Sequence, residues 1–488
     1  MLSERNRTAS SQAWYTQGWG LYAIVVGCLA VLIGGFLLFP PDRVLLAIAA
    51  AVVAIWAIIA LVVSPIGFLA FTMGLYGSMQ AFLLEQQVLA VGAYEINASK
   101  LFVIAVTSLL FFRLLLEMAK YGRLPKPSAS IVLSALLAAW AGQALFRSPN
   151  PGEGTAVVAR MAACSVAFFY AYAFTRSRRD FWLLWLGSAL TTIAASGVAL
   201  FEVLRGRANE LVAIGEFRGA GGFGGAVATG TVAFFGMALA VAVLQSFRLS
   251  RNGRLLSTIT AAAGAVGIVV TFTRTAIVGT VFFLALFLLS SRGSLRDLSV
   301  VRRLVVAALV LGAIGASFQF VSTETMLSRI SDLPGQGGSV AIQSESGSGR
   351  GLIWSSLLRL QSRASPVEWI IGHGMLAVPA DLSRVIRIAV DGHNSILDIL
   401  YDTGVVGLVL YLALALALFR ELRARASLSD EVAGVAAIWW CYIVAYFMST
   451  EMFNGFVYMV GARWYSLIIT GAILALPARP GTDGAAAA

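Results

Sequence analysis

The sequence predicts an all-α membrane protein whose helices cross the bilayer about 12–14 times, with one large loop on the outer face. Hydrophobic residues make up 59% of the 488 residues and charged residues only 12%, and the mean hydropathy is +0.84. Soluble globular domains carry about twice that share of charged residues. Apolar runs long enough to cross the hydrocarbon core recur along most of the chain. We therefore predict a polytopic helical bundle.

About fourteen apolar runs of roughly 20 residues are the candidate spans. They lie at residues 20–39, 43–63, 65–84, 100–118, 129–146, 157–175, 181–203, 222–247, 255–272, 275–291, 302–321, 404–420, 433–450 and 459–476. Some runs are only just long enough, and Pro65 could mark a single broken or re-entrant helix, so about 12 or 13 spans also fit the pattern. The first run, from Leu21, is too long for a signal-peptide core and is predicted to be retained.

Orientation follows from the basic residues, because Lys and Arg collect in the cytoplasmic loops of membrane proteins. The net charge of +11 is concentrated in short clusters at alternate loops, which is a topology signal and predicts no binding to nucleic acid. Both termini are predicted to be cytoplasmic. The predicted regions are transmembrane helices within 1–320, an outer loop at 321–403, transmembrane helices within 404–477, and a disordered cytoplasmic tail at 478–488.

A histidine near the end of the outer loop is the first candidate functional residue. His393 is one of only two histidines, and a neutral imidazole is well suited to moving a proton near pH 7. Ser395 and Asp398 have the capping-box spacing, which predicts a helix start just after His393. The N–H groups of that start would favour a neutral imidazole and could hold a phosphate. The alternative is a loop histidine that only hydrogen-bonds the helix end.

Two arginines are predicted to lie at the same outer face. Arg274 stands between two apolar stretches, where an arginine is costly unless an anion compensates for it. Arg218 adjoins the glycine-rich residues 219–225, whose N–H groups could approach a phosphate closely. Both arginines together suit a diphosphate. The alternatives are that Arg274 reaches lipid phosphates and that Arg218 belongs to a flexible hinge.

Other ionisable residues of the outer face are weaker candidates. Arg350 begins a predicted helix at residues 350–360 and could contact a substrate or pair with Asp381 or Glu368. His373 is predicted to be a loop histidine. The carboxylates of two residues near outer span ends could assist in acid–base chemistry, although such carboxylates are common: Glu202 and Glu451.

Several chemistries are excluded by missing motifs. No glycine-rich loop ends in Lys-Ser/Thr, the two histidines are too far apart for a local metal motif, and no Asp-x-Asp pair suggests a nucleotide-sugar site. Neither a metal nor a cofactor is predicted. The three cysteines lie in apolar runs, which argues against a disulfide framework: Cys28, Cys164 and Cys441.

A set of short motifs together resembles the signature of the O-antigen ligase and polymerase superfamily. The motifs are Phe272-Thr273-Arg274, Gly349-Arg350-Gly351-Leu352-Ile353-Trp354, Ile371-Gly372-His373-Gly374, His393-Asn394-Ser395-Ile396-Leu397 and Asp402-Thr403-Gly404, with Arg218 and Phe223 upstream and Ser148-Pro149-Asn150-Pro151 in a shorter loop. The chain differs from the usual pattern in Thr273 and Thr275 around Arg274, and in Gly224-Gly225.

The resemblance implies a GT-C-like glycosyltransferase in the bacterial inner membrane, with its active site at the periplasmic face. The donor would be a glycan on undecaprenyl diphosphate, and the acceptor a sugar hydroxyl of the lipid A core or of a growing polysaccharide. In this family His393 corresponds to the residue that activates the acceptor, and Arg218 and Arg274 to residues that bind the diphosphate. Arg350 and Asn394 are further candidate substrate contacts. The implied reaction is inverting and needs no metal.

Two other functions remain open from the sequence. In a flippase or transporter of polyprenol-linked glycans, the same arginines would line a translocation path. Such proteins place ionisable residues at mid-membrane in repeated halves, whereas no internal repeat is evident here. A noncatalytic scaffold for polysaccharide assembly would leave the histidine and arginines replaceable.

Overall fold

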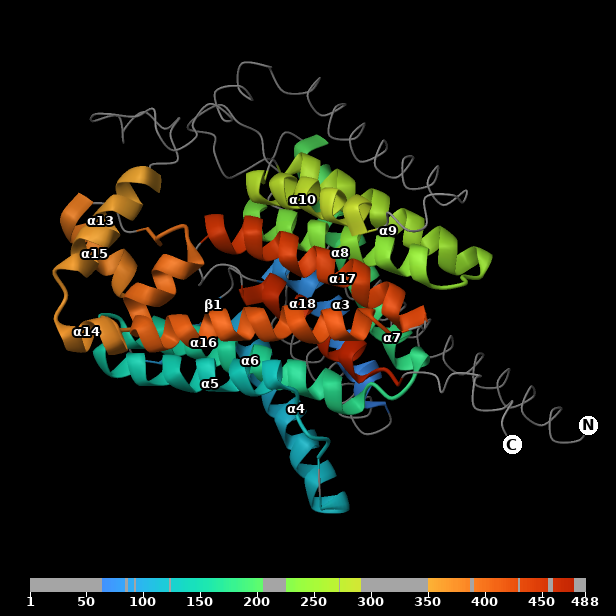
Figure 1. Ribbon diagram of the computed structural model, residues 1–488, viewed down its shortest axis with the longest axis horizontal. Coiled ribbons are helices and arrows are strands. Elements are labelled where there is room, and N and C mark those ends of the chain that lie inside the picture. Colours follow the sequence, from blue (N-terminus) through green and yellow to red (C-terminus); the bar gives the residue numbers. More distant parts are fainter. Residues whose placement is uncertain are drawn as a thin grey trace, which may run out of the picture. The chain divides into compact units, whose positions relative to one another are not determined.

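The computed structural model describes most of the chain as helices (Figure 1). The described residues are 64–83, 87–91, 94–122, 124–204, 225–271, 273–290, 350–386, 390–428, 431–454 and 460–477. The predicted spans at 20–39, 43–63 and 302–321, Arg218 with its neighbouring glycines up to 224, Cys28, and the outer loop up to residue 349 lie outside them.

The prediction of an all-α polytopic membrane protein is confirmed. Among the described residues, eight helices are long and apolar enough to cross a membrane, and three shorter apolar helices accompany them. The helices before the outer loop are α3 (Pro65–Leu83), α4 (Ala98–Tyr121), α5 (Ala129–Gln143), α6 (Pro151–Phe174), α7 (Arg178–Leu204), α8 (Ala226–Ser246), α9 (Arg251–Val270) and α10 (Arg274–Ser290), with a 3₁₀ turn at Ala144–Arg147. The later helices are α13 (Arg350–Ser362), α14 (Pro366–Ile371), α15 (Ala377–Ile386), α16 (Ser395–Ala426), α17 (Glu431–Tyr446), a π-helical turn at Phe447–Glu451, and α18 (Val460–Ala475).

One short connection is not helical. Strands β1 (Gln87–Val91) and β2 (Tyr94–Asn97) form an antiparallel hairpin between α3 and α4. Its strands contain valine, isoleucine and tyrosine, which favour extended backbone. The hairpin is a small exception to the all-α prediction.

Helix α8 lies at the centre of the helical bundle. Every residue from Thr229 to Val243 is buried, as expected for a helix that is apolar on all sides. It packs against α7, α9, α10 and α17. Small residues allow the close approach: a Cβ atom on Gly264 of α9 would lie 2.6 Å from the carbonyl oxygen of Ala233. Small residues serve this purpose in membrane bundles generally.

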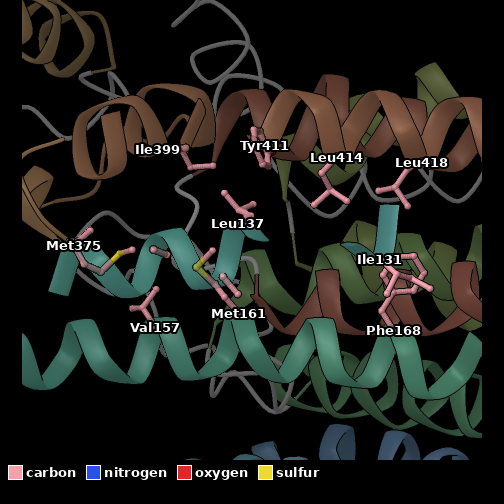
Figure 2. Close-up of a cluster of buried hydrophobic side chains, with 13 residues drawn as sticks. Ile131, Leu137, Val157, Met161, Phe168, Met375, Ile399, Tyr411, Leu414 and Leu418 are labelled. Atoms are coloured by element: carbon pink, nitrogen blue, oxygen red, sulfur yellow. The ribbon is translucent and has the colours of Figure 1, made fainter. Parts of the chain in front are cut away.

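A second group of helices packs beside α16 through a buried apolar cluster (Figure 2). Helix α16 contributes Tyr411, Leu414 and Leu418, which face side chains of α5 and α6. Met375, from the connection between α14 and α15, belongs to the same cluster. The cluster therefore attaches the outer-loop helices to the bundle.

The outer-loop helices form what we call the cap, which comprises α13, α14, α15 and the first turns of α16 up to Thr403. In Figure 1 it lies where α16 begins. The predicted helix at 350–360 is confirmed as α13. Ile353 and Leu357 of α13 pack against Leu382 of α15 and Tyr401 of α16 in a small core of their own.

Helix α16 begins earlier than the span predicted at 404–420 and breaks at Gly404, whose φ is 73°. A Cβ atom on Gly404 would lie 2.3 Å from the carbonyl oxygen of Ile370, and one on Gly372 would lie 2.4 Å from that of Asp402. Only glycine fits this contact. The sequence motifs around Gly372 and Gly404 are therefore explained by the joint between the cap and the spanning part of α16.

Three carbonyl groups next to this break accept hydrogen bonds from donors outside α16. The backbone N–H groups of His373 and Gly374 donate to the carbonyl oxygens of Tyr401 (2.8 Å) and Asp402 (3.1 Å), and Trp140 Nε1 donates to that of Thr403 (2.9 Å). Buried carbonyl groups left without donors would be costly. In addition, the Asp402 carboxylate accepts from the N–H groups of two residues at the start of α15, namely Leu376 and Val378.

Candidate functional site

His393 lies in a tight turn directly before α16 and is paired with a carboxylate. Its Nδ1 atom lies 3.0 Å from Asp391 Oδ1. The Asp391 side chain is 6% exposed, whereas the imidazole is 37% exposed. A carboxylate at Nδ1 holds the proton on that nitrogen and leaves Nε2 as the proton acceptor. Sequence reasoning missed the role of Asp391, although its position two residues before the histidine was visible.

The turn is held by two further hydrogen bonds. Gly392 N–H donates to Asp398 Oδ1 (2.8 Å), and Trp354 Nε1 of α13 donates to the carbonyl oxygen of Gly392 (2.8 Å). His393 itself has φ of 48°, a left-handed conformation that few residues other than glycine adopt. The cap helix α13 and the first turn of α16 thus fix the backbone on both sides of the histidine.

The start of α16 differs from the predicted capping box. The N-cap is Asn394, whose Oδ1 accepts from the N–H groups of Ile396 (3.0 Å) and Leu397 (3.1 Å). Ser395 lies inside the helix, and Asp398 turns back to Gly392. Asparagine caps helices as well as serine does, so a shift by one residue costs little. Those two N–H groups, predicted to be open to a phosphate, are therefore occupied, and the Asn394 side chain holds the turn through its oxygen.

Arg350 lies close enough to the histidine turn to influence it, and Arg274 lies close enough to Arg350 to influence Arg350. Burial lowers the pKa of Arg350, the positive charge of Arg274 lowers it further, and Asp391 raises it. Burial also lowers the pKa of His393, while Asp391 raises it and Arg350 lowers it. Neighbouring positive charges destabilise one another, and an anion bound beside them would relieve this cost.

Arg350 does not form the ion pairs suggested by the sequence. Asp381 accepts instead from Arg384 Nη1 and from Tyr401 (2.8 Å each), and Glu368 forms the capping box of α14. The Arg350 guanidinium carbon lies 5.9 Å from the centre of the Phe453 ring. Its Nε is buried without a hydrogen-bond partner among the described residues. Arg350 is therefore positioned by an aromatic ring, and its guanidinium donors can serve an anion.

Beneath the turn, a buried polar network joins three helices. Ser395 Oγ donates to the carbonyl oxygen of Asn454 (3.1 Å), and Asn454 Nδ2 donates to Thr275 Oγ1 (3.0 Å). Arg463 Nη2 donates to Ser395 Oγ (3.0 Å) and forms an ion pair with Glu451. Sequence reasoning noted Glu451 but missed Arg463, although an arginine within the predicted span 459–476 is a signal of function in membrane proteins.

The other predicted residues lie apart from this constellation or outside the described residues. The His373 ring stacks on Tyr401 at a centroid distance of 4.1 Å, with Nδ1 3.8 Å from Glu368 Oε1. Burial lowers the pKa of His373, and its surroundings are those of a packed side chain of the cap. Glu202 lies near the end of α7. Within the described residues, no group of three or more His, Cys, Asp or Glu side chains could hold a metal ion.

Comparison with known proteins identifies one family. Residues 259–412 match the family described as O-Antigen ligase. The match runs from α9 through the cap into α16, so it contains Arg274, Arg350 and the Asp391–His393 pair but ends before Arg463. No curated protein matches the chain.

Proposed function

The chain is a member of the O-antigen ligase and polymerase superfamily through its O-antigen ligase domain at residues 259–412, and from this premise we propose its reaction. It transfers a glycan from undecaprenyl diphosphate to a sugar hydroxyl during surface-polysaccharide assembly. The observation that carries the proposal is the Asp391–His393 pair (3.0 Å), which is influenced by the charge of Arg350, itself influenced by Arg274. This supports a proposed base next to proposed anion-binding arginines, as the transfer requires.

In the proposed reaction, His393 Nε2 takes the proton of the acceptor hydroxyl while its oxygen attacks the anomeric carbon of the donor sugar. The bond from that carbon to the diphosphate oxygen breaks on the opposite face, so the configuration inverts. Asp391 stabilises the imidazolium that forms. Arg274 and Arg350 stabilise the departing diphosphate by charge-assisted hydrogen bonds, and we propose Arg218 as a further contact.

The same proposal includes the topology. The chain is a multi-pass bacterial membrane protein, and we propose that both termini are cytoplasmic and that the histidine turn faces the periplasm, following the arginine clusters. We propose that Asn394 acts mainly by capping α16 through its side-chain oxygen. Its side-chain NH₂ group could donate a hydrogen bond to a substrate. A scaffold is less well supported, because it has no use for a carboxylate-oriented imidazole. A transporter is less well supported, because no internal repeat is evident in the sequence.

The pH dependence of transfer should report His393. A general base must be neutral, so activity is present above the pKa of His393 and is lost as pH falls through it. Burial holds that pKa below 6.5, so we expect the acid limb of kcat/KM below that pH. Arg350→Gln should move the limb to higher pH, because a positive charge is removed, and Asp391→Asn should move it to lower pH. Shifts of both variants in one direction would contradict the assignment.

Direct transfer in a purified system tests the function itself. The protein in lipid vesicles, given an undecaprenyl-diphosphate glycan, should form product in excess EDTA, because arginines and not a metal ion stabilise the leaving group. Transfer to the lipid A core would identify a ligase, and transfer to a second lipid-linked glycan a polymerase. Activity that requires added Mg²⁺ or Mn²⁺ would disprove the metal-independent mechanism. Movement of the donor across the vesicle membrane without transfer would favour the transporter.

A further inference from the structure

The polar network beneath the histidine turn connects the two halves of the proposed site. Thr275 follows Arg274 at the start of α10, and Ser395 lies two residues after His393 at the start of α16. Asn454 hydrogen-bonds both, through Nδ2 to Thr275 (3.0 Å) and through its carbonyl oxygen to Ser395 (3.1 Å). Asn454 thus bridges α10, which begins at Arg274, and α16, which begins two residues after His393.

Arg463 holds this bridge through Ser395. It donates to Ser395 Oγ (3.0 Å) and pairs with Glu451, which also accepts from Tyr411 (2.7 Å). Glu451 is 3% exposed and Asn454 6%. A buried ion pair contributes little to stability compared with well-packed apolar side chains. Its presence is better explained by the geometry that it imposes on Ser395.

We propose that Asn454, Ser395 and Arg463 are positioning residues that set the separation of His393 and Arg274. The inference rests on the proposed function of these two residues. His393 occupies a left-handed backbone conformation. Trp354 holds the residue before it, Gly392, by a hydrogen bond. Ser395, two residues after it, is held by Asn454 and Arg463. A displacement of the base by about 1 Å can cost about 100-fold in rate, so loss of this support should reduce turnover more than donor binding.

The network also extends the site beyond the matched family region. Asn454 and Arg463 follow residue 412, where the match ends. They are supplied by the segment after the π-helical turn Phe447–Glu451 and by α18. π-helical turns are frequent at functional sites, and this one carries Glu451 as its last residue.

A double-mutant cycle tests the bridge. Ser395→Ala removes the hydroxyl between Arg463 and Asn454, and Thr275→Val removes the acceptor of Asn454 Nδ2 with little change of shape. We expect each variant to lower kcat about 10- to 100-fold and to change the donor KM less than about threefold. Both changes cut the same bridge. The double variant should therefore have a kcat only slightly below that of the less active single variant. Multiplying losses would indicate independent packing defects and overturn the proposal.

Ser466→Ala is the matched control, because it removes a buried hydroxyl of α18 that hydrogen-bonds Tyr442 (2.9 Å). Ser466→Ala should lower Tm about as much as Ser395→Ala and Thr275→Val do, but its kcat should equal that of the wild type. If Ser395→Ala fails to fold, Arg463→Lys can replace it. The lysine keeps the positive charge beside Glu451 but weakens the hydrogen bond to Ser395, so kcat should fall while KM and Tm stay close to the wild-type values. Unchanged kcat in these variants, with His393→Ala inactive, would refute the positioning role while leaving the proposed function intact. An active His393→Ala would refute the proposed function.

Discussion

Replacement of His393 by alanine should reduce glycan transfer about 100- to 10,000-fold, which is the usual contribution of a general base. The imidazole is 37% exposed, so the variant should fold and insert normally. Turnover of a purified lipid-diphosphate donor, measured at saturating acceptor, gives the loss in kcat. Asp391→Asn should lose less, because the imidazole remains but its orientation and charge stabilisation are weakened.

The second histidine provides the control for this experiment. His373→Ala removes a ring stacked on Tyr401 within the cap, so it should lower Tm while kcat of the folded protein stays close to that of the wild type. Turnover by His393→Ala at the wild-type rate would remove the residue from the mechanism. Equal losses of kcat for the two histidines would instead indicate that damage to the cap is sufficient.

Replacement of Arg274 or Arg350 by alanine should lower kcat about 100- to 1,000-fold, since each would stabilise charge that develops on the leaving diphosphate. Lysine should retain only part of the activity, because arginine offers a planar fork of donors and lysine a single point charge. Assays over a range of donor concentrations separate the effects. A charge that acts mainly in the transition state lowers kcat when it is removed and does not merely raise KM.

Arg384→Ala is a matched control for the arginines. Arg384 also belongs to the cap, but its side chain is 73% exposed and pairs with Asp381, so its loss should leave transfer unchanged. If Arg274 merely anchored α10 to lipid phosphates, lysine and alanine would both work nearly as well as arginine. Full kcat with alanine at both positions would make the transporter or scaffold the better account.

The sequence predicted those features that depend on local pattern. Apolar runs located the apolar helices that the structure describes, and the helix predicted at residues 350–360 is α13. The helix start after His393 was one residue off, because Asn394 and Ser395 are both good N-caps and only the surroundings decide between them: Ser395 is engaged by Arg463 and Asn454.

Contacts between distant residues could not be read in this way. Asn454 and Thr275 are 179 positions apart, and no local pattern shows that they meet. The pairing of Arg350 with Asp381 or Glu368 was a reasonable choice by charge alone, but Tyr401 and Ser365 engage those carboxylates instead. The Gly404 motif was noted as a family feature, although its close contact with Gly372 depends on how α14 packs against α16.

The break at Gly404 also determines which part of α16 has to match the thickness of the surrounding lipid bilayer. Helix α16 has 32 residues, about 48 Å at 1.5 Å per residue, which is far more than the roughly 30 Å hydrocarbon core. From residue 405 to its end at Ala426 the helix has 426 − 405 + 1 = 22 residues, about 33 Å, which matches that core. A thicker or thinner bilayer changes the tilt of a spanning helix. Because the break at Gly404 ends the spanning part of α16, the contacts that hold the histidine turn lie beyond the residues that must match the bilayer.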